Sequence, residues 1–553
     1  MTTPLLEVDN LHVCFATRQG NVQALRGVSF SLNPGQTLGI VGESGSGKSV
    51  TSLAVMRLLD RAGRITQGRV LFRGRNITSL GQSDLRQLRG AAMSMIFQNP
   101  RAALNPIRSV EQQIVDVLRA HQPISTAAAR AEALALLRSV LIRDPETRLN
   151  AYPSELSGGM CQRVMIAMAM ACKPALLIAD EPTTGLDVTT QKVVMDLLAD
   201  ITAQRDMATI LITHDLGLAA RYCADIAVME HGLIVERGPT TELFQNPQHP
   251  YTRMLIAASP TRRSTLSDLA QAAPKVPAIP HTRPPGTGPL LEVSHVRKTF
   301  PGNVRAVDDV SFTLAPGGAI GLVGESGSGK TTLSRLICRL ADIDAGDIIF
   351  QGHSISDIPA RDFHRSPFRR QIQIVFQDPH DSLNPRFTAF DCIAHPLRRL
   401  ENLHNGPALE SRVREAADRA GLPTDLLERY PHQLSGGQKA RIGIARAIAP
   451  RPKLLILDEP TAALDVSIQA VILQLLDRLR REDDIGILFV SHDLNVVRML
   501  CEDMVVLQQG RVVEVGPSAA IFASPQADYT RALLDAIPHF DPHTARTPEP
   551  VSP

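Results

Sequence analysis

Residues 42–49 read GESGSGKS, and residues 324–331 repeat the pattern as GESGSGKT. Both match G-x-x-x-x-G-K-[S/T], a loop whose glycines let backbone N–H groups surround phosphate oxygens at the start of a helix. A strand-like apolar run precedes each copy, and helical apolar spacing follows it. The sequence therefore predicts two phosphate-binding loops. The residues expected to bind phosphate are Gly42, Ser44, Gly45, Gly47, Lys48 and Ser49 in the first loop, and Gly324, Ser326, Gly327, Gly329, Lys330 and Thr331 in the second.

The last two residues of each loop supply the rest of its chemistry. The ammonium groups of Lys48 and Lys330 can reach the β- and γ-phosphates of a nucleotide. The hydroxyls of Ser49 and Thr331 can each offer one oxygen to Mg²⁺. Because both loops keep both residues, we expect two nucleotide sites with the same ligands.

The rest of the chain repeats along with the loop. Corresponding landmarks return at a spacing of about 280 residues, far longer than the ~20 to 50 residues of solenoid repeats. We therefore expect two duplicated domains, residues 1–260 and residues 289–553, the second ending in a short C-terminal tail. Residues 261–288 are rich in proline and lack core periodicity, which predicts a linker.

Composition excludes several classes of function. Lys and Arg total 58 against 56 Asp and Glu, and Trp is absent, so neither a basic field nor stacking platforms indicate a nucleic-acid partner. The seven cysteines are scattered without a C-x-x-C pair, which fits a reducing cytosol better than disulfides or zinc. The N-terminus has no signal pattern, and no apolar run approaches the ~18 residues needed to span a bilayer. If the protein serves a membrane, other chains would span it.

Two glutamines follow strand-like runs in the shared pattern F-Q-[N/D]-P. Gln98 and Gln377 would each lie at a strand exit near a phosphate loop, where the amide could hold Mg²⁺ or the attacking water. A polar residue that merely caps a strand is the alternative for either one alone. The recurrence of the whole pattern favours the functional interpretation.

An acidic pair closes a short, continuously apolar run in each half, as expected of a buried parallel strand. Ligands of α/β sheets bind at such carboxyl ends. We expect Asp180 and Asp458 to bind Mg²⁺ directly or through water. Glu181 and Glu459 would polarise the water that attacks the γ-phosphate.

A histidine ends a further apolar strand in each half, at His214 and His492. A lone histidine in this position is more often structural. Beside a γ-phosphate, however, it can stabilise the charge that develops during phosphoryl transfer. We therefore include both histidines among the candidate catalytic residues.

Leu-Ser-Gly-Gly precedes a predicted helix in each half. Ser157 and Ser435 would cap the helices, and Gly159 and Gly437 would let the backbone approach a phosphate closely, which predicts a second anion site in each unit. Cys161 lies one helical turn after Ser157, where the helix N-terminus would lower the pKa of its thiol. The alternative for Cys161 is an inert, packed residue.

Together these motifs closely resemble those of the ATP-binding cassette ATPases, over both halves of the chain. The resemblance implies an α/β fold with two tandem P-loop NTPase domains, each with a RecA-like parallel-sheet core, a helical subdomain and an antiparallel β subdomain. It also implies an intramolecular head-to-tail dimer with ATP and Mg²⁺ at two composite sites. One site would combine Lys48, Ser49, Gln98, Asp180, Glu181 and His214 with Ser435 and Gly437. The other would combine Lys330, Thr331, Gln377, Asp458, Glu459 and His492 with Ser157 and Gly159. By position, Phe15 and Phe300 match the aromatic residue that stacks on adenine in the family.

A narrower resemblance lies in NPQHPYTRMLIAASP (246–260), which is similar to the tail of oligopeptide, dipeptide and nickel importer ATPases. The second half keeps only Tyr529, Thr530 and Arg531 from the middle of this stretch. The resemblance implies import of a small solute through two membrane permease subunits, supplied by an extracytoplasmic solute-binding protein. The ATPase would then be peripheral on the cytoplasmic face of the inner membrane. Peptides are the first expectation for the cargo, with nickel complexes, opines and other small solutes left open.

A soluble tandem cassette that acts on ribosomes or DNA is the alternative. Ribosome-acting relatives carry a long, highly charged helical linker, and DNA-repair relatives carry zinc-binding cysteines. Here the expected linker is short, proline-rich and nearly neutral. These features favour an importer ATPase, with no nucleic-acid partner.

Overall fold

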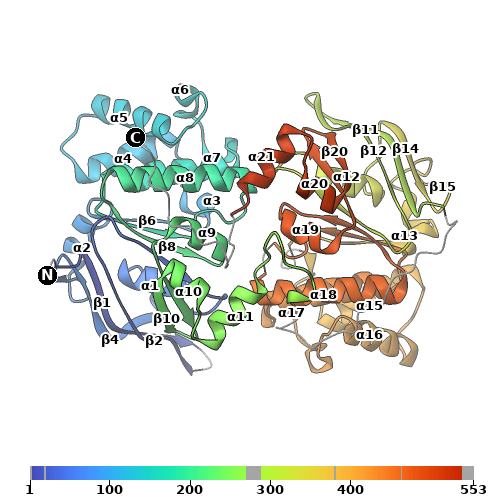
Figure 1. Cartoon of the computed structure of the whole chain (residues 1–553), viewed down its shortest axis with the longest axis horizontal. Coiled ribbons are helices and arrows are strands. Elements are labelled where there is room, and N and C mark those ends of the chain that lie inside the picture. The colour runs from blue at the N-terminus through green and yellow to red at the C-terminus, as the bar shows by residue number, and fades with distance from the viewer. Residues whose placement is uncertain (1–2, 18–19, 270–287, 379–381, 463, 539–553) are drawn as a thin grey trace. The chain divides into compact units, whose positions relative to one another are not determined.

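The computed structural model describes residues 3–17, 20–269, 288–378, 382–462 and 464–538 (Figure 1). Contacts divide the chain into two compact units, the first mainly from residues up to Ile256 and the second mainly from Ala257 to Ile537. Both units contain the same layers, which confirms the expected α/β fold class. The exact domain boundaries stay predictions, since residues 270–287 of the expected linker lie outside the described residues.

The first unit is built on two sheets. The antiparallel sheet has the order β2-β1-β4-β5, with β1 at Leu6–Thr17, β2 at Gly20–Leu32, β4 at Gly63–Phe72 and β5 at Arg75–Asn76. The six-stranded sheet has the order β10-β9-β3-β8-β7-β6, with β3 at Thr37–Val41, β6 at Met93–Ile96, β7 at Leu176–Asp180, β8 at Ala208–Thr213, β9 at Asp225–Glu230 and β10 at Leu233–Pro239. Its pairs are parallel except β9 with β10, which is antiparallel.

Helices make up the rest of the first unit, and α4, α5 and α7 pack together as a helical layer (Figure 1). Serine hydroxyls cap these helices, since Ser109, Ser125 and Ser157 each accept the backbone N–H of the residue three positions later. The helices are α1 (Lys48–Val55), α2 (Gln82–Leu88), α3 (Pro100–Ala103), α4 (Val110–His121), α5 (Thr126–Ser139), α6 (Pro145–Arg148), α7 (Gly158–Met170), α8 (Val188–Gln204), α9 (Leu216–Tyr222), α10 (Thr240–Gln245) and α11 (Pro250–Ala258).

The second unit repeats this plan. Its antiparallel sheet has the order β12-β11-β14-β15, with β11 at Leu291–Phe300, β12 at Val304–Leu314, β14 at Ala345–Phe350 and β15 at His353–Ser354. Its larger sheet has the order β16-β17-β18-β13-β19-β20, with β13 at Ala319–Val323, β16 at Ile372–Val375, β17 at Leu454–Asp458, β18 at Gly486–Val490, β19 at Asp503–Gln508 and β20 at Arg511–Pro517. The helices include α12 (Lys330–Ile337), α13 (Phe368–Gln371), α15 (Ala389–Leu400), α16 (Pro407–Arg419), α17 (Gly436–Ile448), α18 (Val466–Asp483), α19 (Leu494–Leu500), α20 (Ser518–Ala523) and α21 (Asp528–Ala536).

The strands that carry the acidic pairs are buried on both faces. In β7, Leu176 and Ile178 pack with the antiparallel sheet and α1, whereas Leu177 and Ala179 pack with the helical layer. This two-sided burial explains the continuous apolar run, because a strand with one face in water would alternate apolar and polar residues.

Among the described residues, no helix combines the length and apolarity needed to cross a membrane.

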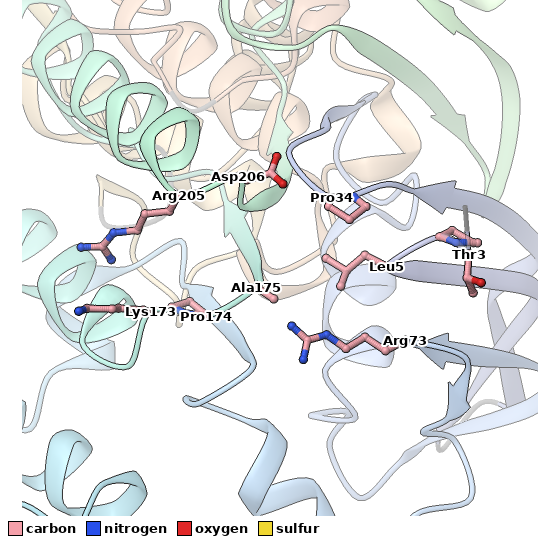
Figure 2. A pocket seen from close by; sticks show the side chains of 10 residues that line it. Thr3, Leu5, Pro34, Arg73, Lys173, Pro174, Ala175, Arg205 and Asp206 are labelled. Carbon is pink, nitrogen blue, oxygen red and sulfur yellow. The ribbon is translucent and has the colours of Figure 1, made fainter. Parts of the chain in front are cut away.

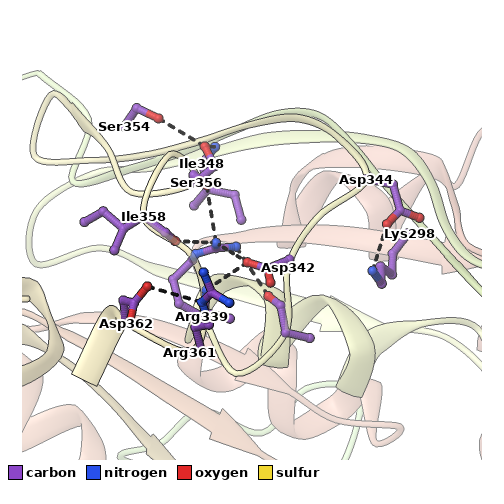
Figure 3. Close-up of polar contacts among 12 residues, drawn as sticks. Lys298, Arg339, Asp342, Asp344, Ile348, Ser354, Ser356, Ile358, Arg361 and Asp362 are labelled. Atoms are coloured by element: carbon purple, nitrogen blue, oxygen red, sulfur yellow. Dashed lines mark hydrogen bonds and ion pairs between the residues drawn. The ribbon is translucent and has the colours of Figure 1, made fainter. Parts of the chain in front are cut away.

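A buried arginine joins two parts of the second unit. Arg339 follows α12 in left-handed backbone (φ 53°), and its side chain is only 1% exposed. Its guanidinium pairs with Asp342 (2.8 Å) and donates to the carbonyl oxygens of Ser356 (3.3 Å) and Ile358 (2.6 Å) (Figure 3). The contacts tie the helix behind the phosphate loop to the segment that follows the antiparallel sheet.

We expect Arg339→Ala to destabilise the second unit, because it removes the donors of a buried network and leaves carbonyl oxygens unpaired. The free energy of unfolding of that unit should fall by about 3 kcal/mol. Urea unfolding, followed by the exposure of peptides from residues 288–538, would measure it. Arg361→Ala is the control, since the Arg361 side chain is 86% exposed and, among the described residues, forms an ion pair only with its neighbour Asp362. Equal effects of the two substitutions would contradict this assignment.

Candidate functional site

The first phosphate loop connects β3 to α1, and close packing fixes its backbone. A Cβ atom on Gly42 would lie 2.2 Å from the carbonyl oxygen of Met229, and one on Gly47 would lie 2.8 Å from Leu25. Both glycines have positive φ, at 150° and 106°. Gly47 also precedes the first helical residue of α1, so the loop leads into the helix N-terminus as expected for anion binding.

The loop lysines are buried and fold back over their own loops. Lys48 Nζ donates to the carbonyl oxygens of Gly42 (2.8 Å) and Glu43 (2.9 Å). Lys330 Nζ makes the same bonds to Gly324 (2.8 Å) and Glu325 (2.7 Å). Each ammonium therefore lies beside the first two residues of its loop.

The aspartates of the acidic pairs lie beside the loop hydroxyls. Ser49 Oγ donates to Asp180 Oδ1 at 3.0 Å, and Thr331 Oγ1 donates to Asp458 Oδ1 at 3.3 Å. Asp180 is 5% exposed and forms no ion pair with any described residue. Burial raises the pKa of Asp180 to about 6, and burial likewise raises the pKa of Asp458.

The glutamate that follows each aspartate holds several side chains together. Glu181 Oε2 accepts hydrogen bonds from the amide of Gln98 (2.7 Å) and the hydroxyl of Thr184 (3.0 Å), and Oε1 lies 3.3 Å from His214 Nδ1. Glu181 also has left-handed backbone (φ 47°), which is uncommon for a residue other than glycine and turns the chain sharply at the end of β7.

Electrostatic coupling between Glu181 and His214 shifts both groups. Burial works against the charge on Glu181, but the hydrogen bond and charge of His214 lower the pKa of Glu181 to about 2. Burial also works against a charged His214, yet the hydrogen bond and charge of Glu181 raise its pKa overall. The pair thus favours a carboxylate beside an imidazolium, poised at the strand ends.

The second unit repeats this arrangement with one difference. Gln377 Nε2 donates to Glu459 Oε2 (2.7 Å), His492 Nδ1 lies 3.3 Å from Glu459 Oε1, and Glu459 has φ of 49°. The pKa of Glu459 is again lowered and that of His492 raised. Ala462 occupies the position of Thr184, so Glu459 lacks the hydroxyl contact.

These residues fit Mg²⁺ and a nucleoside triphosphate. A divalent cation would compensate the buried Asp180 carboxylate, whose raised pKa reports the cost of carrying charge there. No cluster of three or more acidic, histidine or cysteine side chains suited to a metal occurs among the described residues. Phosphate oxygens would therefore complete the coordination, as is usual for Mg²⁺ in phosphoryl-transfer sites.

The remaining predicted residues form no hydrogen bond or ion pair with these networks within their own unit, among the described residues. Ser157 and Gly159 begin α7, and Ser435 and Gly437 begin α17, where both serines cap their helices. Phe15 is half-buried on β1, and Phe300 is 41% exposed at the end of β11. Their proposed contacts with nucleotide stay predictions.

The hypothesis of a reactive Cys161 is wrong. The residue is fully buried in the helical core of the first unit, and its thiol faces the carbonyl oxygen of Pro153 at 3.6 Å. Burial raises the pKa of the thiol, which overrides the effect expected from the nearby helix N-terminus. The packed, inert alternative is correct.

A cavity of about 910 Å³ lies elsewhere in the first unit (Figure 2). Pro174 and Ala175 come just before β7, and Arg205 and Asp206 come just before β8. The cavity is therefore at the starting ends of strands whose other ends carry Asp180 and Thr213. It is separate from the phosphate loop.

Two family models match the sequence in duplicate. The model described as "ABC transporter" matches residues 25–184 and 307–462, together more than half of the chain. This chain belongs to the ABC transporter family. A second model, "Oligopeptide/dipeptide transporter, C-terminal region", matches residues 235–287 and 513–552. The protein is therefore a tandem ABC transporter ATPase with oligopeptide/dipeptide-type C-terminal regions, and membership of this family implies ATP binding and permease partners.

Curated relatives extend over nearly the whole ABC ATPase. The peptidoglycan transport ATP-binding protein YejF of Agrobacterium fabrum is 44% identical over 97% of this chain and 96% of its own length. The glutathione import ATP-binding protein GsiA of Escherichia coli O157:H7 is 44% identical over 98% of this chain and 91% of its own length. The resemblance inferred from the motifs is confirmed.

The structure adds contacts that motif analysis missed. A comparison of the two halves in sequence shows Thr184 only as a difference from Ala462. The turn after β7 is what places its hydroxyl 3.0 Å from the Glu181 carboxylate. Tyr251 and Tyr529 contact the phosphate loops from more than 200 residues away. Their shared Tyr-Thr-Arg motif was a signal, but it did not indicate what the tyrosines touch.

Asp180→Asn is expected to stabilise the nucleotide-free ABC ATPase near pH 8. A raised pKa means that the folded protein retains a proton between pH 3.8 and about 6 that the unfolded chain has released, so stability falls as pH rises through this window. Removing the buried charge should raise the free energy of unfolding by about 1 to 2 kcal/mol above this window. Thermal unfolding at pH 5 and pH 8 would measure the difference.

The gain should shrink at pH 5, where Asp180 is largely protonated. Asp458→Asn should act in the same direction on the second unit, because its pKa is raised by the same cause. Destabilisation by Asp180→Asn at pH 8 would show that the carboxylate is not strained by burial.

Proposed function

We propose that this ATPase hydrolyses ATP at two sites and that hydrolysis energises the import of a small peptide-like solute. The network of glutamine, glutamate and histidine at the carboxyl ends of the buried strands carries this proposal. It is present in both halves with matching distances, 2.7 Å from Gln98 to Glu181 and 2.7 Å from Gln377 to Glu459. Two complete sets of side chains argue for two active sites.

Each side chain has a role that follows from its position. Glu181 and Glu459 orient and polarise the attacking water through carboxylates kept ionised by their lowered pKa. His214 and His492 hold those carboxylates in place and offer positive charge near the transferred group. When bound, Mg²⁺ would neutralise charge on the β- and γ-phosphates. Asp180 and Ser49, or Asp458 and Thr331, would hold it, with Gln98 and Gln377 close by.

The sites are proposed to be composite. Ser435 and Gly437 would close over the nucleotide at Lys48, and Ser157 and Gly159 over that at Lys330. The exposed serine caps and adjacent glycines support this proposal, because such helix starts present backbone N–H groups without a Cβ in the way. Both cassettes of one chain would then form an intramolecular dimer.

The proposed cargo is a di- or oligopeptide, or a peptide derivative of similar size. The C-terminal regions match those of oligopeptide/dipeptide transporters, and the relatives include a glutathione importer, glutathione being a tripeptide. Two permease subunits and an extracytoplasmic solute-binding protein would complete the system. The ATPase would lie on the cytoplasmic face of the inner membrane. The same C-terminal regions argue against action on ribosomes or DNA.

Glu181→Gln and Glu459→Gln should each lower ATP turnover by at least about tenfold, because the amide cannot take up a proton from the attacking water. ATP binding should persist, since neither substitution touches the phosphate loop. Steady-state hydrolysis and equilibrium binding of Mg-ATP would test this. Glu242→Gln, an exposed change on α10, is the control. One silent substitution beside one that abolishes activity would refute two equivalent active sites.

The transport role predicts that the ATPase co-purifies with membrane permeases from its own cells, and that deleting it abolishes uptake of labelled di- or tripeptides. Complementation with the Glu181→Gln variant should fail to restore uptake. Co-sedimentation with ribosomes, together with undiminished peptide uptake in the deletion strain, would favour the alternative function.

A further inference from the structure

The tail motif Tyr-Thr-Arg begins a helix in each unit and has no role in the networks above. Residues 251–253 lie in the first turn of α11, and residues 529–531 in the first turn of α21. The two tails also share a Pro-Gln pair before the motif and a leucine two residues after it, and Tyr-Thr-Arg is their longest common run. Their contacts explain why a tyrosine stands first.

Each tail tyrosine binds the backbone of its own phosphate loop. The N–H of Glu43 donates to Tyr251 Oη at 3.0 Å, and the N–H of Glu325 donates to Tyr529 Oη at 3.0 Å. These glutamates are the second residues of the two loops. Their carbonyl oxygens accept the bonds from Lys48 and Lys330 described above. One peptide segment is thus held by the tail on one side and by the loop lysine on the other.

The element that presents the tyrosine is itself firmly anchored. The carboxylate of Glu236 on β10 accepts the N–H groups of Gln248 (2.7 Å) and His249 (3.0 Å), just before α11. Glu514 on β20 does the same for Gln526 (2.9 Å) and Ala527 (3.2 Å) before α21. The start of each tail helix is therefore fixed to an edge strand of the same sheet that carries the phosphate loop.

The motif arginines and apolar residues add to this anchoring. Arg253 donates to the carbonyl oxygen of Pro247 (3.4 Å), and Arg531 to that of Pro525 (2.9 Å). Tyr251 is 8% exposed, and Leu255, one turn later, is 4% exposed. Burial raises the pKa of Tyr529 to about 12, so its phenol stays neutral and can accept from the loop N–H.

We infer that Tyr251 and Tyr529 are positioning residues of the two ATP sites, which act through the second residue of each phosphate loop. The hydroxyl fixes the peptide whose carbonyl oxygen orients the loop lysine, so it sets where that lysine meets the nucleotide. This inference rests on the proposed roles of the loop residues. It gives the C-terminal region a part in nucleotide binding, in addition to any part in transport.

Tyrosine-to-phenylalanine substitutions test the inference, because they remove one hydroxyl and keep the buried ring. In the full chain, Tyr251→Phe should speed amide hydrogen exchange in peptides covering residues 38–49 and leave residues 320–331 unchanged. Tyr529→Phe should show the opposite pattern. Tyr222→Phe is the matched control, since its hydroxyl donates to Asp196 (2.7 Å) away from the loop.

The double variant Tyr251→Phe/Tyr529→Phe should raise KM for Mg-ATP about three- to tenfold, the range expected for one lost hydrogen bond per site. The value of kcat should change less, because the loop holds the phosphates in both the ground state and the transition state. The thermal midpoint should match that of Tyr222→Phe, which separates positioning from a loss of fold.

Unchanged loop exchange together with unchanged KM would overturn the inference. A fall in thermal midpoint with proportional loss of kcat and no change in KM would also overturn it, since that pattern indicates a structural role only. If Glu181→Gln left turnover unchanged, the proposed catalytic roles would fail. Faster exchange confined to the loop facing the substituted tyrosine would still support the contact inferred here.

Discussion

Two-sided burial of the central strands is the constraint on which both sites depend. Because β7 and β17 are covered on both faces, polar residues cannot occur within them and gather where the strands end. The parallel order of the strands then directs all these ends to one edge of the sheet. Asp180, Glu181 and His214 meet there although two different strands carry them. Glu181 turns the chain at this edge with left-handed backbone, a conformation that the surrounding structure must stabilise.

Much of this edge could be predicted from sequence, because its signals are local. Glycines at fixed spacing predict a phosphate loop, and an apolar run that ends in Asp-Glu predicts a strand end. Gln98 and Glu181 were both assigned to strand exits, but the hydrogen bond between them was not predicted. Cys161 shows where local inference fails. Its position on a helix was correct, but its burial against the helical layer decides the pKa of its thiol, and burial depends on residues far away in sequence.

Contacts between distant segments could not be predicted for the same reason. The pairing of Tyr251 with Glu43 spans the whole cassette and leaves no periodic pattern. In sequence Arg339 resembles an ordinary surface arginine, yet its carbonyl partners lie on a segment beyond the antiparallel sheet.

The two halves also support equivalent groups differently. Thr184 contacts the glutamate in one half, and Ala462 replaces it in the other. Gln438 completes a capping box with Ser435, where Met160 leaves Ser157 with a one-way cap.

The anchoring of the tail helix by Glu236 has a practical consequence for anyone who truncates the chain. A fragment that stops after β10 retains every motif by which the first cassette is recognised in sequence. It lacks α11, however, and with it the partners of Glu236 and the hydroxyl that meets Glu43. A fragment that keeps these contacts must extend past His214 by α9, the strand pair of β9 and β10, α10 and α11. Its C-terminal boundary is set by hydrogen bonds and cannot be read from the motifs.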